Sequence, residues 1–179
     1  MITTVGKHRA AALADYLYRT DHVIVFAESC TAGLISATLG QIPGVSQWLA
    51  GSAVVYQIET KTEWLQVDQT LLQDPGPVSQ IVSEQMAIGI LNHTPQASIS
   101  ASVTGHLGPN APQNLDGLAW SSIALRAGDK ILTTSRLLQL DRHQSADHPN
   151  SRSEIDLRHD RQCTAAELVL QFCVEQLES

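Results

Sequence analysis

A serine stands where a short apolar run of β-branched residues gives way to a stretch with helical spacing. Ser29 lies in the segment Phe26–Gly33, and this segment comes directly after the run Val23–Val25. The helical stretch begins near Thr31. A turn from strand to helix leaves backbone N–H groups that favour negative charge. Such a turn could orient an attacking oxygen and stabilise an oxyanion. The structural alternative is that Ser29 or Thr31 only caps the helix, since both residue types are preferred there.

Cys30 offers a second nucleophile in the same turn, because a thiol at a helix N-terminus can have a lowered pKa. The other two cysteines, Cys163 and Cys173, lie in a stretch whose residue pattern indicates a helix. Ten residues of helix span about 15 Å, too far for a disulfide bond. Disulfide support is therefore not expected.

Further motifs accompany the serine. They are Ala27–Gly33 with Ile42–Ser46, Gly51–Tyr56 with Lys61, Val103–Gly105 with Gly108-Pro109, and the segments Pro77–Ser79 and Glu84–Ala87. Together they resemble the C-terminal domain family of the competence-damage-inducible protein CinA. The likeness runs from about Ala10 to Leu125. Stand-alone members of this family are nicotinamide-nucleotide amidohydrolases, so the resemblance implies deamidation of nicotinamide mononucleotide to nicotinate mononucleotide and ammonia.

The resemblance implies that Ser29 is the catalytic nucleophile and Lys61 its general base. A serine hydroxyl attacks poorly unless a neighbour removes its proton. A lysine desolvated in a pocket can have its pKa drawn toward neutrality, and Ser–Lys pairs are a known variant of the catalytic triad. Because the resemblance points to the serine, Cys30 ranks second as nucleophile.

A nucleotide substrate also needs binding groups. On the resemblance, we expect them to be Glu28, Cys30, Thr31, Gly33, Tyr56, Thr104 and Gly105. The N–H groups from Cys30 to Gly33 would stabilise the oxyanion, and hydroxyls with a close glycine backbone suit phosphate oxygens. Tyr56 would pack or hydrogen-bond against the substrate. Neither a metal nor a cofactor is expected.

Each of these positions also has a structural interpretation. Lys61 could be a solvated lysine at the start of a helix, the usual situation of lysine. Tyr56 could be an aromatic residue at a strand edge, and Thr104-Gly105 the end of a strand before a loop.

The chain departs from the family pattern near the expected site. Gln57-Ile58 replaces a small polar Ser-Asn pair, and the loop after Gly105 has side chains and a second proline where the family has glycines. The loop should therefore differ in shape. His106 could be a substitute acid or base, since the pKa of histidine is near neutrality. The interpretation we favour is a histidine in a surface loop. These changes leave two alternatives open: a non-catalytic nucleotide-binding or accessory homologue, or an amidase for another small carboxamide.

Composition narrows the class of protein. The chain has 179 residues, 43% of them hydrophobic, with a formal net charge of −7 and a pI near 5.4. Only 11 residues are Lys or Arg, which disfavours a nucleic-acid partner. No apolar run approaches the ~18–20 residues that span a bilayer, and no signal sequence is recognised at the start. We expect a cytoplasmic protein that contacts no membrane, and the resemblance implies a homo-oligomer.

Hydrophobic periodicity predicts alternating helices and strands. The predicted helices are residues 10–18, 31–39, 78–91 and 164–177, and the predicted strands are 23–26, 52–56, 98–103, 119–125 and 131–138. The last two strands, joined by Ala127–Lys130, are expected to form a hairpin. In the first helix, Tyr18 is expected on the buried face. The pattern predicts one α/β domain over residues 1–179, a three-layer sandwich with a mixed sheet between helices.

Residues 141–161 are expected to form a polar, mobile surface excursion, since more than half of them are Asp, Glu, Arg or His. Its histidines, His143, His148 and His159, match no compact metal-ligand spacing. On the resemblance, Arg158 or Arg161 would contact a phosphate or a partner subunit.

Overall fold

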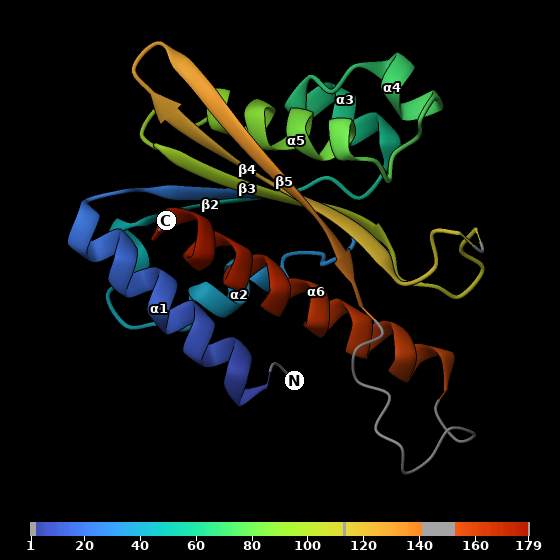
Figure 1. Ribbon diagram of the computed structural model, residues 1–179, viewed down its shortest axis with the longest axis horizontal. Helices are drawn as coiled ribbons and strands as arrows, with labels where there is room; N and C mark the ends of the chain where they lie inside the picture. Colours follow the sequence, from blue (N-terminus) through green and yellow to red (C-terminus); the bar gives the residue numbers. More distant parts are fainter. Residues whose placement is uncertain (1–2, 113, 141–152, 179) are drawn as a thin grey trace.

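A computed structural model of the protein describes residues 3–112, 114–140 and 153–178. These residues form a five-stranded sheet in the order β2-β1-β3-β4-β5 (Figure 1). The strands are β1 (Ile24–Glu28), β2 (Leu49–Val54), β3 (Ile99–His106), β4 (Leu118–Ala127) and β5 (Lys130–Gln139). The first three strands are mutually parallel, while β4 and β5 add as antiparallel strands, so the sheet is mixed.

Helices cover both faces of the sheet (Figure 1). One layer consists of α1 (Thr4–Thr20), α2 (Leu34–Leu39) and α6 (Glu154–Leu177), and the other of α3 (Ile58–Leu65), α4 (Gln69–Gln73) and α5 (Gln80–Asn92). A short 3₁₀ helix, Val45–Gln47, leads into β2. This arrangement is the three-layer α/β sandwich predicted from the sequence.

The alternation of side chains along β1 divides the core into two parts. Ile24 and Phe26 belong to the cluster beneath α1, α2 and α6, whereas Val25 and Ala27 belong to the cluster beneath α5. All five residues of β1 are buried, as expected for a strand covered on both faces. The alternation also sets which way the residues after the strand face.

Several predicted elements occur close to their expected positions. The helix at 10–18 lies within α1, and the strand at 98–103 overlaps β3. The helix at 78–91 corresponds to α5. The predicted hairpin is β4–β5, and Gly128 in its turn has φ +61°, which favours glycine.

Other boundaries were wrong. The helix expected from Thr31 begins only at Leu34, because Ala32 and Gly33 have φ values of 51° and 95° and make a left-handed turn first. Strand β2 ends at Val54, so Tyr56 lies in the following connection. Tyr18 is 68% exposed, not buried, and packs edge-on against Trp48 at the rim of α1. Helices α3 and α4 were not predicted.

The last helix starts ten residues earlier than predicted. Ser153 and Asp156 form a reciprocal capping box, which begins α6 at Glu154. The expected polar excursion at 141–161 is therefore wrong for its final part, where Arg158 and Arg161 are helical. The earlier part of that segment, with His143 and His148, lies outside the described residues.

A close approach between helices α3 and α5 fixes the position of α3. A Cβ atom at Gly89 would lie 2.1 Å from the carbonyl oxygen of Leu65, the last residue of α3. Only glycine allows this separation. Lys61 lies one helical turn before Leu65, so the same contact also places Lys61.

Replacing Gly89 with alanine is expected to push α3 away from α5. The free energy of unfolding should fall by about 1–3 kcal/mol, the usual cost of overpacking, despite the better helix propensity of alanine. Urea denaturation measures the change, and Asn92→Ala at the exposed end of α5 is the control. An unchanged midpoint for Gly89→Ala would contradict this account of the packing.

Candidate active site

A cavity of about 270 Å³ opens where the parallel strands end. The carboxyl ends of β2, β1 and β3 meet at the same edge of the sheet, and ligands of open α/β sheets bind at this kind of edge. The lining residues include Ser29 and Cys30 after β1, Tyr56 after β2, and Thr104 and later residues at the end of β3. Segments far apart in the sequence thus converge on one space.

Ser29 and Lys61 touch at the floor of this cavity. Lys61 Nζ lies 3.0 Å from Ser29 Oγ, and it also donates to the carbonyl oxygens of Val55 at 2.7 Å and Tyr56 at 3.4 Å. The lysine is only 2% exposed and the serine 7%. The interpretation of Lys61 as a solvated helix-start lysine was therefore wrong.

Burial lowers the pKa of Lys61 to about 8, although the nearby Cys30 raises it. A neutral amine has two N–H groups and one lone pair. With the N–H groups donated to the carbonyls of Val55 and Tyr56, the lone pair faces the Ser29 hydroxyl. This geometry suits a proton acceptor whose pKa is near the working pH.

Cys30 lies beside this pair but is poorly suited to attack. Its side chain is 3% exposed, and burial raises the pKa of its thiol to about 12, against the lowering effect of its backbone N–H and Lys61. The thiolate is the nucleophilic form of cysteine. At neutral pH Cys30 is therefore a protonated thiol in the cavity wall, and the second-ranked nucleophile loses its chemical basis.

Glu28 stabilises the turn between β1 and α2. Its buried carboxylate accepts hydrogen bonds from the Thr31 hydroxyl, the backbone N–H groups of Gly33, Ile35 and Ser36, and the Ser52 hydroxyl. These bonds are 2.8–3.1 Å long. The carboxylate thus satisfies the N-terminal donors of α2. It was expected to bind substrate, but the structure places it beneath the turn, away from the cavity.

Thr31 and Gly33 are likewise not among the residues that line the cavity. The Thr31 hydroxyl and the Gly33 N–H both donate to Glu28, and the N–H of Ala32 donates to the carbonyl of Ser29. Of the expected oxyanion donors, the N–H groups of Cys30 and Thr31 are those that donate to no other residue within the described part of the chain.

Thr104 and Gly105 do line the cavity. However, Thr104 donates its hydroxyl proton to the carbonyl of Pro77 at 2.8 Å, so the hydroxyl can only accept a further bond. A Cβ at Gly105 would lie 2.4 Å from the Cβ of Ala119 on β4. Glycine is thus needed there for the approach of the neighbouring strand, and the phosphate argument for both positions loses its physical reason.

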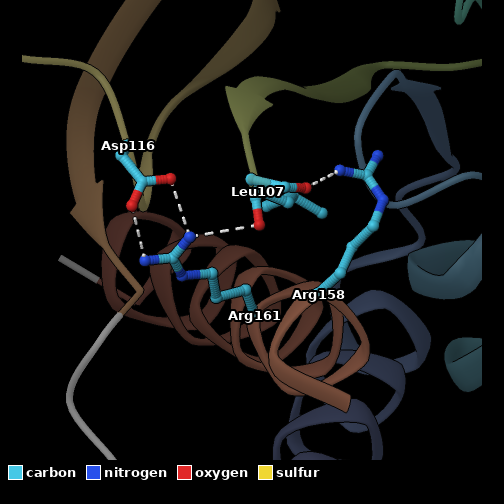
Figure 2. Close-up of polar contacts among 5 residues, drawn as sticks. Leu107, Asp116, Arg158 and Arg161 are labelled. Carbon is cyan, nitrogen blue, oxygen red and sulfur yellow. Dashed lines mark hydrogen bonds and ion pairs between the residues drawn. The ribbon is translucent and has the colours of Figure 1, made fainter. Parts of the chain in front are cut away.

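The mouth of the cavity is crossed by a tyrosine and an arginine. Tyr56 is 50% exposed, and its hydroxyl accepts a hydrogen bond from Arg158 of α6. Arg158 also donates to the carbonyl of Gly108 (Figure 2). Of the two arginines expected near a phosphate, Arg158 is the one that lines the cavity.

His106, the last residue of β3, is partly buried and lines the cavity, so the favoured view of a surface-loop histidine was wrong. Burial lowers its pKa, while Asp116 raises it. Burial is the larger of these two effects, so the pKa of His106 is lowered overall.

Part of the cavity wall consists of residues that were assigned no site role from the sequence. It is formed by Ile58, Pro77, Val78, and the segment Leu107–Ala111. Pro77, Val78 and Gly108-Pro109 belong to the motif segments, but their mostly apolar side chains carry no chemical signal that assigns them to a site. Gln162 of α6 was also missed; it donates to the carbonyls of Cys30 and Thr31 at 3.2 Å and ties α6 to the serine turn.

Within residues 3–112, 114–140 and 153–178 the structure offers neither a metal site nor a membrane span. Those residues contain no group of three or more His, Cys, Asp or Glu side chains that could hold a metal ion. In the same described ranges, no helix is long and apolar enough to cross a membrane.

Comparison of sequences identifies related proteins. A family model of the CinA C-terminal domain matches residues 7–150. The chain is similar to a CinA-like protein of Mycobacterium tuberculosis (strain H37Rv), with 36% identity over 138 residues that cover 76% of this chain and 29% of that protein. A CinA-like protein of Mycolicibacterium vanbaalenii is 39% identical over 116 residues, covering 64% and 27%. The chain thus spans less than a third of these relatives.

Solved structures share the fold over nearly their whole length. The competence/damage inducible protein CihA of Agrobacterium tumefaciens has a TM-score of 0.82 at 23% identity, covering 100% of this chain and 99% of that one. A competence or damage-inducible protein of Enterobacter asburiae has a TM-score of 0.80 at 24% identity, covering 98% and 99%. At this identity the likeness concerns the fold alone.

Replacing Glu28 with glutamine is expected to weaken the turn. The amide NH₂ would face donors, and the charge-assisted bonds would be lost, so the free energy of unfolding should fall by roughly 2–4 kcal/mol. Urea denaturation measures this, with Glu63→Gln at an exposed position of α3 as the control. Equal stability of the two variants would show that the carboxylate charge is not needed.

Proposed function

The chain belongs to the CinA C-terminal domain family, and from that premise we propose that it is an amidohydrolase that converts nicotinamide mononucleotide to nicotinate mononucleotide and ammonia. The observation that carries the proposal is the contact of 3.0 Å between Lys61 Nζ and Ser29 Oγ inside a cavity. A buried lysine with a pKa of about 8 beside a serine hydroxyl matches the chemistry of a Ser–Lys hydrolase.

In the proposed reaction, neutral Lys61 takes the proton of Ser29 as the serine oxygen attacks the carboxamide carbon. The tetrahedral oxyanion accepts a hydrogen bond from the N–H group of Cys30, which lines the cavity. Lys61 then gives the proton to the amide nitrogen, and ammonia leaves. Water, activated by the same amine, attacks the ester on Ser29, which releases the carboxylic acid and restores the serine hydroxyl.

The charge at the cavity mouth supports an anionic substrate. Arg158 bonds only to neutral oxygens within the described residues, the Tyr56 hydroxyl and the Gly108 carbonyl, so its positive charge is not paired there with a carboxylate. An arginine fork suits a phosphate group. We therefore assign phosphate recognition to Arg158 and stacking or hydrogen bonding of the substrate to Tyr56. A homo-oligomer remains part of the proposal, and light scattering during gel filtration tests it.

Two substitutions test the catalytic pair. Ser29→Ala and Lys61→Ala should each lower ammonia release from nicotinamide mononucleotide by at least about 1,000-fold, as expected when members of one catalytic unit are removed. Cys30→Ala should lower it by less than about tenfold, because the thiol is protonated. Activity that survives in Ser29→Ala but disappears in Cys30→Ala would assign the reaction to the cysteine.

The substrate panel separates the remaining alternatives. Release of ammonia from another small carboxamide, and not from the nucleotide, would indicate a different amidase. Binding of the nucleotide in calorimetry without turnover of any substrate would indicate a non-catalytic homologue, the outcome that the changed residues Gln57-Ile58 favour.

The pH dependence of kcat/KM should show the titration of Lys61. The base acts only when neutral, so the rate should rise as pH increases through about 8 and level off above about 9. Lys61→Arg should be inactive at every pH, since arginine stays protonated. A rise centred below pH 6.5 would instead point to His106, whose pKa is lowered by burial.

A further inference from the structure

Arg161 is a buried arginine that joins α6 to both ends of the loop over the cavity. Its guanidinium donates from Nη1 to the carbonyl of Leu107 at 3.1 Å and to Asp116 Oδ1 at 2.8 Å, and from Nη2 to Asp116 Oδ2 at 3.0 Å (Figure 2). The Arg161 side chain is 7% exposed, whereas that of Asp116 is 43% exposed. We name these contacts the clasp.

The clasp closes the loop at its base. Leu107 follows the last residue of β3, and Asp116 lies just before β4, where it forms an isolated bridge with His106. The residues from Leu107 to Ala111 form one wall of the cavity. Since Arg161 contacts both ends of this loop, it determines where the wall lies relative to Ser29.

The backbone at Gly108 is fitted to the clasp. This glycine has φ +64°, and a Cβ there would lie 2.8 Å from Arg161 Nη1 and 2.9 Å from Asp116 Oδ1. Any side chain at this position would therefore press on the ion pair. There is no room for a side-chain atom between the backbone of Gly108 and the ion pair.

We propose that Arg161 is a positioning residue, which holds the Leu107–Ala111 wall in its binding shape through Asp116 and so controls substrate affinity without taking part in the reaction at Ser29. This inference rests on the proposed function for its kinetic readout. It also separates the two arginines of α6. Arg158 is among the residues that line the cavity, whereas Arg161 is not among them and contacts the loop at Leu107 and Asp116.

The geometry requires an arginine at this position. The planar guanidinium makes a bidentate contact with the Asp116 carboxylate and, at the same time, a third hydrogen bond to the Leu107 carbonyl. A lysine has one compact ammonium group and cannot reproduce this fork. Arg161→Lys keeps the charge but loses the shape, and Asp116→Asn keeps the shape but removes the charge of the partner.

The test compares Arg161→Lys and Asp116→Asn with wild type. Both variants should raise KM for nicotinamide mononucleotide at least tenfold, with kcat within about threefold and an unchanged pH profile. Amide hydrogen exchange in residues 105–117 should be at least tenfold faster. The control is the surface pair of α1, with Arg19→Lys and Asp15→Asn, which should change neither measurement. Gly108→Ala should raise KM in the same direction while both clasp residues remain present.

Three results would overturn the inference. They are unchanged exchange in the loop, a loss of kcat with unchanged KM, or a shifted pH profile that places Arg161 in the proton transfer. If Arg161→Lys does not fold, Asp116→Asn at an exposed side chain decides. If the wild type has no amidase activity, the proposed function fails separately. Loop exchange and the Kd of nicotinate mononucleotide in calorimetry then test the clasp, and unchanged values of both would overturn it.

Discussion

The buried carboxylate of Glu28 holds the turn on which the rest of the site depends. The chain must leave β1, make a left-handed turn and begin α2 within a few residues, which leaves backbone donors with no partner inside the helix. One carboxylate satisfies three of these donors and two hydroxyls. Because successive residues of a strand face opposite sides, Glu28 faces α2 while Ser29 faces the layer that contains Lys61.

The position of Lys61 depends on tight packing elsewhere and has an energetic cost. The close approach of Gly89 to Leu65 places α3, and burial lowers the pKa of the lysine to about 8. Since this pKa lies below that of a lysine in the unfolded chain, the charged form opposes folding below about pH 8. The opposition diminishes as pH rises toward the unfolded value. The lowered pKa of Lys61 is therefore obtained at the expense of stability.

Prediction from sequence identified Ser29 and Lys61 better than the residues around them. Ser29 and Lys61 were named from motifs, and the structure brings them into contact. Thr31 and Gly33 were assigned to the substrate because a hydroxyl suits phosphate oxygens and turn N–H groups suit an oxyanion, yet the Thr31 hydroxyl and the Gly33 N–H donate to Glu28. The sequence shows which residue lies near a nucleophile, but it does not show whether the donor group of that residue faces a ligand or a helix end.

The sequence by itself determined the layered α/β fold, the hairpin and the chemical types of the site residues, because periodicity, turn glycines and local motifs depend on neighbouring positions. Only the tertiary structure decided the partners of those residues. The contact between Arg161 and Asp116, and the position of the wall from Leu107 to Ala111 beside Ser29, join segments far apart in the chain. Their meeting is set by how strands pair and helices pack, which local sequence patterns do not encode.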